Sequence, residues 1–195
     1  MQPEDRCHLN GLALKDGSPA YVTAISSTNV TEGWRDHRQS GGVVIDIESN
    51  EIIGRGFSMP HSPRWHNGKF WLANSGTGEF GWVDLTSGKF EPVAFYPGYV
   101  RGAAFHGNYA ILGLSRPRDN KTFNGLALDD RLEKEQINAR SGLVVVDLTT
   151  GGIPHSLNAE GFISELYDVV VLPGVKRPSM IGFKNDQIRR ILSIE

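Results

Sequence analysis

The alternation of apolar and polar positions repeats along this chain. Three stretches each contain an apolar run that ends at an aspartate and continues through a polar turn into a second apolar run. They are GGVVIDIESNEI (41–52), FGWVDLTSGKF (80–90) and SGLVVVDLTTGGI (141–153), with Asp46, Asp84 and Asp147 at the shared position. Repetition of a strand-turn-strand unit indicates an array of similar sheets. Because the aspartates recur beside polar turns, we interpret them as structural turn-capping residues.

Two further strands are expected before each of these units. The second strand of each unit falls in YVTAISS (21–27), FWLANSG (70–76) and YAILGLS (109–115), and the first in NGLAL (10–14), PRWH (63–66) and RGAAFH (101–106). Turns rich in Gly and Asn separate these runs, as tight hairpins require. The spacing from Asp46 to Asp84 is close to the ~40–45 residues of a four-stranded blade. The sequence therefore predicts an all-β chain with β-propeller architecture.

The number of blades is less than a closed propeller usually has. A fourth copy starts at YDVVVLPG (167–174) and continues as SMIGFKN (179–185), which gives one domain over 1–195 with units at about 8–62, 63–100, 101–166 and 167–195. Propellers close with about four to eight blades. The chain is thus a small four-bladed ring, a partial ring completed by self-association, or the C-terminal part of a larger, six-bladed-like propeller that lacks its N-terminal blades. We favour the last interpretation and predict that the chain alone does not close a monomeric ring.

The third unit carries an insertion of mixed polar character at 116–140. It accounts for the longer spacing between Asp84 and Asp147. Leu128, Leu132 and Ile137 recur at helical spacing within it. The insertion is therefore predicted to be partly helical, with the helix around 128–137.

Composition and charge restrict the partners of this chain. Its 195 residues are 39% hydrophobic and 22% charged, with a formal net charge of −2. Without a basic field we expect no nucleic-acid partner, and without an apolar stretch of ~20 residues we expect no membrane partner. Cys7 is the only cysteine, and the first residues do not resemble a signal peptide, so a cytoplasmic location is predicted. No motif identifies a cofactor.

Three blocks of the chain, CHLNGLAL (7–14), SMPHSPRWH (58–66) and LYDVVVLPG (166–174), resemble an uncharacterised bacterial family of conserved hypothetical proteins with a domain of unknown function. The resemblance covers nearly the whole chain. Members of that family carry additional sequence before the first block, which supports the larger-propeller interpretation, and the family implies no activity. More distantly, NGLAL (10–14) resembles the blade start of lactonase or NHL-like propellers, in which an Asn at the position of Asn10 helps to hold a divalent metal.

The longest polar connections fall on one face of the predicted propeller. Loops on a rigid scaffold often carry function, so this face is the candidate site. Aligning the first strands places Asn10, Arg64, Arg101 and Asp168 at equivalent positions near the mouth of the central channel. Two arginines there favour a small anionic ligand, either a carboxylate or a phosphate. The alternative is that Arg64 and Arg101 form structural salt bridges with Asp168 and Glu165.

His61 lies on the same face, in a segment that two prolines stiffen, and with Asp168 it is the candidate catalytic residue. The leading hypothesis is a propeller that binds a small anionic ligand through Asn10, Arg64, Arg101 and Glu165, with no metal. A metal-dependent, lactonase-like hydrolase would instead use Asn10 and Asp168 as ligands and His61 as base. A non-catalytic interaction scaffold is the third alternative, and the sequence does not decide whether the protein is an enzyme. We predict that the five residues Asn10, His61, Arg64, Arg101 and Asp168 converge on one channel mouth.

Overall fold

The computed structural model describes residues 3–116, 124–161 and 163–178. Within these ranges the chain forms three antiparallel sheets of four strands each. The first sheet contains β1 (Leu9–Lys15), β2 (Ser18–Ala24), β3 (Gly42–Asp46) and β4 (Ile52–Phe57). The second contains β5 (Pro60–His66), β6 (Lys69–Asn74), β7 (Glu79–Asp84) and β8 (Lys89–Phe95). The third contains β9 (Tyr99–His106), β10 (Tyr109–Ser115), β11 (Gly142–Asp147) and β12 (His155–Asn158). The all-β prediction and the order of the strands in each of these units are confirmed.

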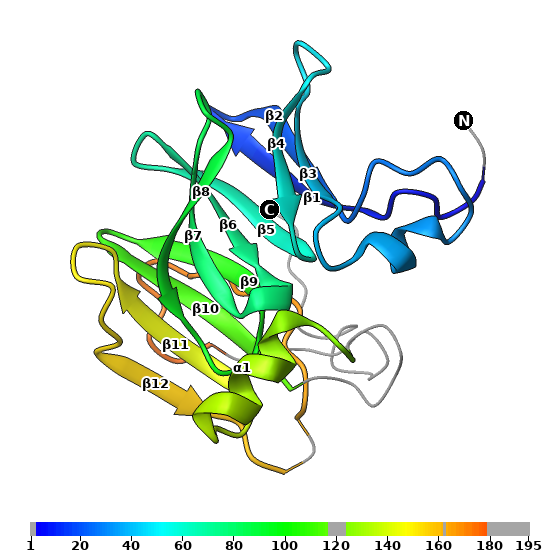
Figure 1. Cartoon of the computed structure of the whole chain (residues 1–195). Helices are drawn as coiled ribbons and strands as arrows, with labels where there is room; N and C mark the ends of the chain where they lie inside the picture. Colours follow the sequence, from blue (N-terminus) through cyan, green and yellow to red (C-terminus); the bar gives the residue numbers. More distant parts are fainter. Residues whose placement is uncertain (1–2, 117–123, 162, 179–195) are drawn as a thin grey trace, which may run out of the picture.

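The three sheets pack face to face, with their first strands β1, β5 and β9 side by side (Figure 1). Successive residues of a strand point to opposite faces, so a central sheet needs apolar residues on both. Strand β6 meets this requirement, because Phe70 and Leu72 pack in the core shared with the first sheet while Trp71 and Ala73 pack in the core shared with the third. The result is a propeller-like stack of three sheets.

One end of the stack, which we call the turn end, consists of short hairpins. The three recurring aspartates lie here, and each carboxylate accepts a hydrogen bond from a backbone N–H two or three residues further along the chain. The donors are Ser49 to Asp46 at 2.8 Å, Thr86 to Asp84 at 2.9 Å and Thr149 to Asp147 at 2.8 Å. The predicted turn-capping role is confirmed.

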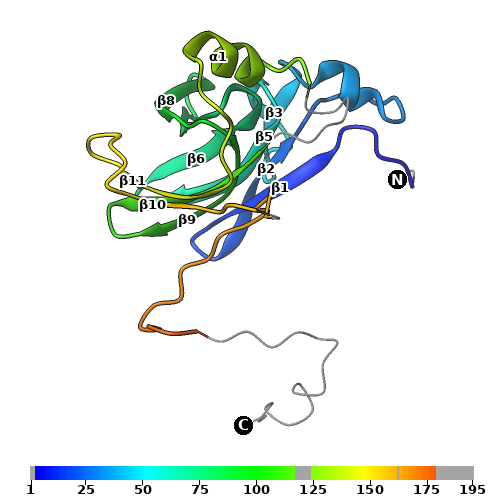
Figure 2. The ribbon, with the colours of Figure 1, turned by 90° about the horizontal axis from the view of Figure 1, so that it is seen from below.

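The opposite end, which we call the loop end, carries the longer connections. They include η1 (Gly33–His37), η2 (Ser75–Thr77) and α1 (Ala127–Glu135). Figure 2 shows α1 and the short blue helical turn η1 on the same side of the sheets. A separate apolar cluster fills this end, and Ile25, Trp34, Met59 and Tyr99 pack there with residues of the helical insertion.

Helix α1 forms where the sequence predicts it. Leu128 and Leu132 are buried in the loop-end cluster, and Ile137 packs against it half-buried. The Asp129 carboxylate accepts hydrogen bonds from the backbone N–H groups of Gly125 and Leu126, which stabilises the start of the helix. The helical prediction for the insertion is confirmed over these residues, and residues 117–123 lie outside the described part.

The segment 163–178 follows the third sheet but forms no strand. It runs along β9 and β10, where an added side-chain carbon at Gly102 would meet the backbone of Asp168, and then extends away from the sheets (Figure 2). The strand predicted at 167–174 is therefore wrong for this structure, because no strand of the described residues pairs with it and its apolar side chains are mostly exposed. The continuation predicted at 179–185 lies outside the described residues.

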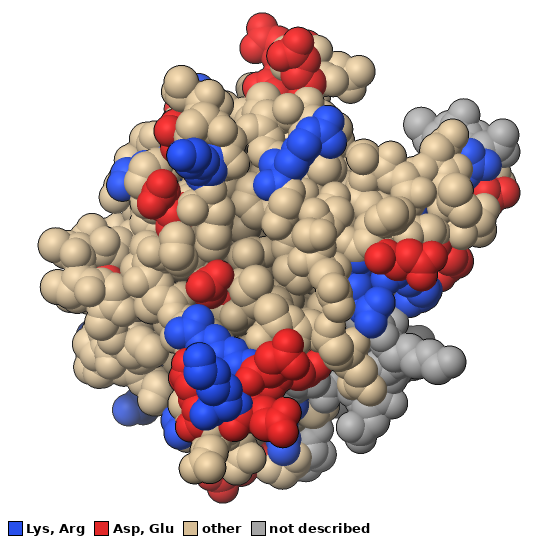
Figure 3. Space-filling view, in the orientation of Figure 1, with Lys and Arg blue, Asp and Glu red and all other residues tan. Residues whose placement is uncertain are grey.

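The face of the molecule in Figure 3 is mostly uncharged and carries small groups of basic and acidic side chains that adjoin each other. Over α1 the Arg131 guanidinium lies 2.9 Å from Glu135 and 3.6 Å from Glu79. Among the helices of the described ranges, none has both the length and the apolar composition needed to cross a bilayer.

Candidate functional site

The first strands of the second and third sheets carry the same irregularity near the loop end. Strand β5 has one extra residue between His61 and Arg64, and β9 has one extra residue directly after Arg101. Ser62 and Gly102 lie in these bulges with φ of 50° and 74°, in the left-handed region. The Gly102 N–H donates a hydrogen bond of 2.9 Å to the Ser62 hydroxyl, so the two bulges face each other across the sheets.

The strand pairing gives an alignment of the candidate residues that differs from the predicted one. Across the paired strands, His61 aligns with Phe80 of β7 and Arg101 aligns with Leu143 of β11. Each of these partners stands four residues before the turn aspartate of its sheet, Asp84 or Asp147. Arg64 lies level with the residue two places before Asp84. The prediction that Arg64 and Arg101 are equivalent is therefore wrong, because Arg64 precedes its hairpin residue His66 by two positions, whereas Arg101 precedes the matching His106 by five. Arg101 corresponds to His61, and Asn10 is itself the unpaired residue of a bulge in β1.

Each of the three nitrogens of the Arg64 guanidinium donates a hydrogen bond to the protein. Its Nε donates to the Ala103 carbonyl at 3.0 Å, its Nη1 to the Pro63 carbonyl at 3.0 Å, and its Nη2 to the Asp168 carboxylate at 3.1 Å. The side chain thus ties β5 to β9 and to the segment that follows the third sheet. Arg64 thus has the geometry of a structural salt bridge with Asp168, as the alternative to ligand binding required.

The Arg101 guanidinium is more deeply buried and less well bonded. Its side chain is 19% exposed, and Nη1 lies 3.7 Å from a Glu165 carboxylate oxygen, beyond ordinary hydrogen-bonding distance. The central guanidinium carbon of Arg101, Cζ, lies 4.4 Å from the centre of the Tyr167 ring, in a cation–π contact. Its Nε is buried and has no hydrogen-bond partner in the described part of the chain. Arg101 is thus a half-buried cation whose buried Nε–H has no acceptor among the described residues.

His61 is held next to Arg101 as a neutral side chain. Its Nδ1 lies 2.8 Å from the Met59 carbonyl, which can only accept, so Nδ1 carries the proton and Nε2 is left as an acceptor. Burial, and to a lesser degree the charge of Arg101, lower the pKa of His61 to about 3. The ring also makes an edge contact with Tyr99, with centroids 5.5 Å apart.

The remaining candidate at this end, Asn10, has both ends of its amide engaged. Its Nδ2 donates to the Pro60 carbonyl at 2.7 Å, and its Oδ1 accepts from the Thr23 hydroxyl at 2.8 Å. Asn10 therefore links β1 to the residue before His61. The structure brings the candidates together in pairs, Arg64 with Asp168 and Arg101 with Glu165, and it places His61 within electrostatic range of Arg101.

The loop end also contains Tyr167, a site residue that the sequence did not single out. Its ring makes a cation–π contact with Arg101, whereas the sequence drew attention to its neighbour Asp168. Beside the mouth, His8 stacks on Trp34 with centroids 4.3 Å apart, and both rings reach the same Asp5 carboxylate. No spacing rule predicts these contacts, because they depend on how separate loops fold back.

The residues of this site do not fit a metal centre. In residues 3–116, 124–161 and 163–178, no three His, Cys, Asp or Glu side chains lie close enough together to hold a metal ion. Asn10 and Asp168, the ligands of the hydrolase hypothesis, are bonded to protein groups instead.

Fold and site together define a propeller-like all-β protein with a polar, partly buried cluster at the loop end of its sheets. The chain belongs to the family described as Domain of unknown function (DUF4915), whose model matches residues 1–181. The resemblance to an uncharacterised family is thereby confirmed. No curated protein matches the chain.

Two solved structures of designed proteins are similar to this chain. The computationally designed Ika4 protein aligns with a TM-score of 0.51 and 12% identity, over 88% of this chain and 84% of its own. The computationally designed Ika8 protein aligns with a TM-score of 0.46 and 13% identity, over 84% of this chain and 40% of its own. At such low identity, the similarity to Ika4 concerns the fold alone.

Proposed function

We propose that this protein binds a small anionic ligand, a carboxylate or a phosphate, at Arg101 on the loop end. The observation that carries the proposal is the buried Nε of Arg101, which has no acceptor in the described part of the chain, in a side chain only 19% exposed. Buried donors are almost always hydrogen-bonded, and an exception calls for a missing partner. An anion that accepts from Nε and a terminal nitrogen together would supply the bidentate contact that a guanidinium prefers.

Arg64 shows what a satisfied arginine looks like in the same fold. It donates to two carbonyl groups and a carboxylate at 3.0–3.1 Å. Arg101 has a cation–π contact and one ion pair at 3.7 Å. The difference supports Arg101, and not Arg64, as the residue that contacts the ligand.

In this proposal Glu165 is the internal counter-ion of the site. Its carboxylate lies 3.7 Å from Arg101 Nη1, which is too far for an ordinary hydrogen bond, and its side chain is 20% exposed. An incoming anion would displace it from Arg101, since two carboxylates close to each other repel. The segment 163–178 therefore lies where it would respond to the ligand.

His61 completes the proposed site as a neutral hydrogen-bond acceptor. A histidine whose pKa is about 3 is unprotonated at neutral pH and is a weak base. Its Nε2 suits a hydroxyl group of the ligand better than a proton-transfer step. We therefore assign binding, not catalysis, to His61, and a structural role to Asp168 as the partner of Arg64.

The test is a calorimetric titration with inorganic phosphate and with acetate, combined with thermal melting, on the full chain and two matched variants. Arg101→Ala should weaken binding by about 10- to 150-fold, the worth of a charge-assisted contact of about 1.5–3 kcal/mol. Arg64→Ala should lower the melting temperature more than Arg101→Ala and leave anion affinity nearly unchanged. Glu165→Gln should strengthen binding, because it removes the competing charge.

Two results would contradict the proposal. One is a large loss of stability in Arg101→Ala with unchanged anion affinity, which would identify Arg101 as a structural partner of Glu165. The other is the absence of saturable binding of both anions to wild type and to Glu165→Gln.

A further inference from the structure

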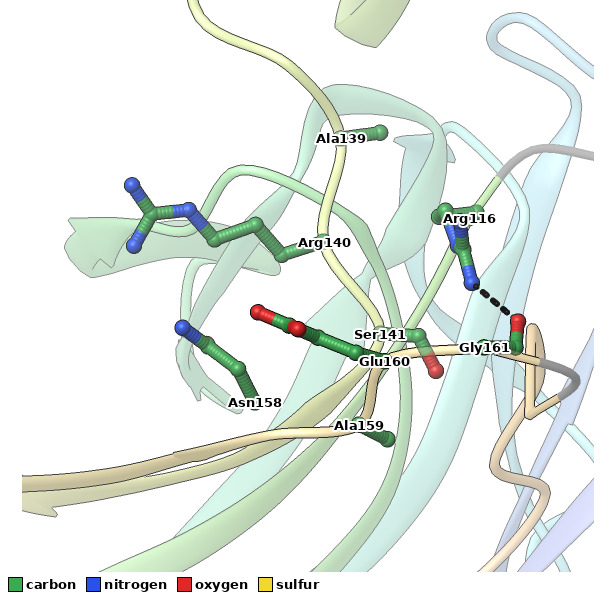
Figure 4. Close-up of a pocket in the computed structure, with 8 residues that line it drawn as sticks. All are labelled: Arg116, Ala139, Arg140, Ser141, Asn158, Ala159, Glu160 and Gly161. Carbon is green, nitrogen blue, oxygen red and sulfur yellow. Dashed lines mark hydrogen bonds between the residues drawn. The ribbon is translucent and has the colours of Figure 1, made fainter.

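The segment 163–178 is anchored to the third sheet at its start. Arg116, which follows β10, donates from Nη2 to the Gly161 carbonyl at 3.2 Å, on the wall of a polar cavity of about 330 Å³ (Figure 4). The same nitrogen donates to the Ile163 carbonyl at 3.3 Å, and the Arg116 backbone N–H donates to the Ser164 carbonyl at 2.8 Å. The chain therefore enters the segment at a fixed position beside the end of β10.

Beyond this anchor, the segment occupies the place of a first strand. At the end of β6, the Ser75 hydroxyl donates to the carbonyl of Val100 in β9, the first strand of the next sheet. Ser115 holds the matching position at the end of β10, and its hydroxyl donates to the Leu166 carbonyl at 3.2 Å and accepts from the Leu166 N–H at 2.9 Å. Leu166 thus stands in the segment where Val100 stands in β9.

The backbone of this segment has unused hydrogen-bonding groups. Among the described residues, no group bonds to the N–H or the C=O of Val170 or Val171, and the Val170 side chain is 76% exposed. In the three sheets, each first strand (β1, β5 or β9) pairs antiparallel with a second strand (β2, β6 or β10). An unpaired strand edge is a template for the addition of another strand.

The face of the third sheet beside this edge is apolar. Because their neighbours along β10 and β11 pack in the core shared with the second sheet, Ile111, Leu143 and Val145 point to the opposite face, where they are half-buried. The segment covers part of this face, since an added Cβ at Gly113 would lie 3.2 Å from Val169 Cγ2. The free edge of the segment and these three side chains together form what we call the docking surface.

A comparison with the first sheet shows what the docking surface lacks. Tyr21 of β2 and Tyr109 of β10 each pair with the turn aspartate of their sheet. Tyr21 is 6% exposed, and Phe70 of the following second strand, β6, packs against its ring with centroids 5.1 Å apart. Tyr109 is 42% exposed. In the described structure the third sheet therefore lacks the second strand that would cover it.

The chemistry of the absent strand follows from β6 and β10. Alternate apolar side chains of these strands pack on the preceding sheet, Phe70 and Leu72 in β6 and Ala110 and Leu112 in β10. From the described residues a second copy of this chain has no such strand to offer, because β2, β6 and β10 are each paired on both sides. An extended peptide with the same alternation has both of its edges free.

We infer that the docking surface binds an extended peptide of a partner protein by strand addition. The peptide lies antiparallel to 169–172, exchanges backbone hydrogen bonds with alternate residues of that stretch, and packs alternate apolar side chains on Ile111, Leu143 and Val145. In this mode of recognition the main-chain bonds supply affinity and the alternate side chains supply specificity. The inference does not depend on anion binding at Arg101.

The experiment titrates the synthetic peptide KFTLTVK into the full chain by isothermal calorimetry. Phe, Leu and Val alternate with Thr in this peptide, so that they lie on one face of a strand. Two control peptides each lack one recognised feature. KTFLVTK has the same composition without the alternation, and KFTLTVK with N-methyl groups on every residue between the lysines has no backbone donors there. KFTLTVK should bind saturably, and each control should bind at least about 10-fold more weakly.

Matched variants locate the peptide on the protein. Val145→Lys places a charge on the apolar face and should weaken peptide binding at least about 10-fold. Leu12→Lys, at a residue of the first sheet that is 47% exposed, should bind the peptide as wild type does. Because successive N–H groups of a strand point to opposite edges, one of Val170→Pro and Val171→Pro should lose peptide binding and the other should retain most of it. Thermal melting shows that each variant is folded.

Four outcomes would overturn the inference. The first is no saturable heat with KFTLTVK up to millimolar concentration. The second is equal binding of KTFLVTK, which would indicate non-specific apolar adhesion. The third is unchanged binding in Val145→Lys. The fourth is slow amide hydrogen exchange at both Val170 and Val171 in the free protein, which would show that the edge is already occupied. Light scattering then distinguishes a second copy from further residues of the same chain.

Discussion

The turn end and the loop end of the three sheets differ in how their polar side chains are bonded. At the turn end the same device occurs three times, and each aspartate accepts a backbone N–H at 2.8–2.9 Å. At the loop end the buried Arg101 and Ser141 keep donors without acceptors in the described structure. The hydrogen-bonded aspartates stabilise the repeated turns. A buried donor without an acceptor lowers the stability of the fold, so its presence calls for another explanation. The comparison directs the search for function to the loop end.

The largest expected loss of stability comes from replacing a glycine with alanine at the loop end, and a glycine at the turn end serves as the comparison. Both glycines have backbone conformations in the left-handed region. Gly102 in the β9 bulge has φ of 74°, and an added Cβ would lie 2.7 Å from the Asp168 Cα. Gly107 at the turn end has φ of 57° and no atom within 4 Å of such a Cβ. Gly102→Ala should therefore destabilise the fold by about 2–4 kcal/mol, and Gly107→Ala by about 1–2 kcal/mol.

Urea denaturation measures both variants, and protease accessibility of 163–178 reports whether that segment has been displaced by Gly102→Ala. Equal losses in the two variants, with no change in cleavage, would mean that the segment does not rest on β9.

The next effect depends on pH. Because burial first and Arg101 second lower the pKa of His61 from 6.5 to about 3, the unfolded chain binds a proton at this residue that the folded chain does not. The contribution of His61 to stability is complete above pH 6.5 and declines as the pH falls toward 3. Between pH 6.5 and 5 the wild type should lose up to about 2 kcal/mol more than His61→Gln.

This window lies above the pH range in which Asp46 and Asp84 titrate in the folded chain, since hydrogen bonds within their own turns lower the pKa of both carboxyl groups below the usual value of 3.8. The exposed His106 at the turn end provides the control, and His106→Gln should retain the pH profile of the wild type. An identical profile for His61→Gln would show that the imidazole is not buried as described.

Local patterns predicted the strands and turns well. The aspartate caps, the Asn-Gly type hairpins and the helix carrying Leu128 and Leu132 all follow from residues close in sequence. Strand β6 could be recognised because both of its faces are apolar, as a strand between two sheets requires.

The parts that failed depend on tertiary contacts. Arg101 is in register with His61 because each precedes its hairpin histidine, His106 or His66, by five residues, whereas the prediction aligned the strand starts. The bulges in β5 and β9, which no apolar pattern marks, bring Ser62 and Gly102 together. The predicted strand at 167–174 has a strand-like sequence but no neighbouring strand in the described structure. Ser141 had no signal, because a lone serine before a strand acquires meaning only when its hydroxyl is found buried and unbonded.

A smaller effect is expected from removing a turn-end cap. Asp147→Ala should destabilise the fold by about 1 kcal/mol, because the Thr149 N–H loses its acceptor at 2.8 Å and can bond to water instead. Asp147→Asn keeps a side-chain oxygen and should recover most of the loss. Equilibrium denaturation of the two variants, with a phosphate titration alongside, should show altered stability and unaltered binding. A change in phosphate affinity would contradict the separation between the two ends.

The smallest effect concerns two left-handed residues that are not glycine. Ser62 in the β5 bulge has φ of 50°, and Asn67 in the neighbouring turn-end hairpin has φ of 48°. Asn tolerates this conformation, so Asn67→Gly should change stability by less than about 0.5 kcal/mol. Ser62→Gly relieves strain but removes the hydroxyl that accepts the Gly102 N–H at 2.9 Å, so the two terms partly cancel. A net destabilisation of about 0.5–1 kcal/mol is expected. Urea denaturation at matched protein concentration resolves the two variants. If Ser62→Gly were stabilising instead, the bonded bulges would contribute nothing beyond an ordinary turn, and the loop end would owe its distinct character to Arg101 and Ser141 alone.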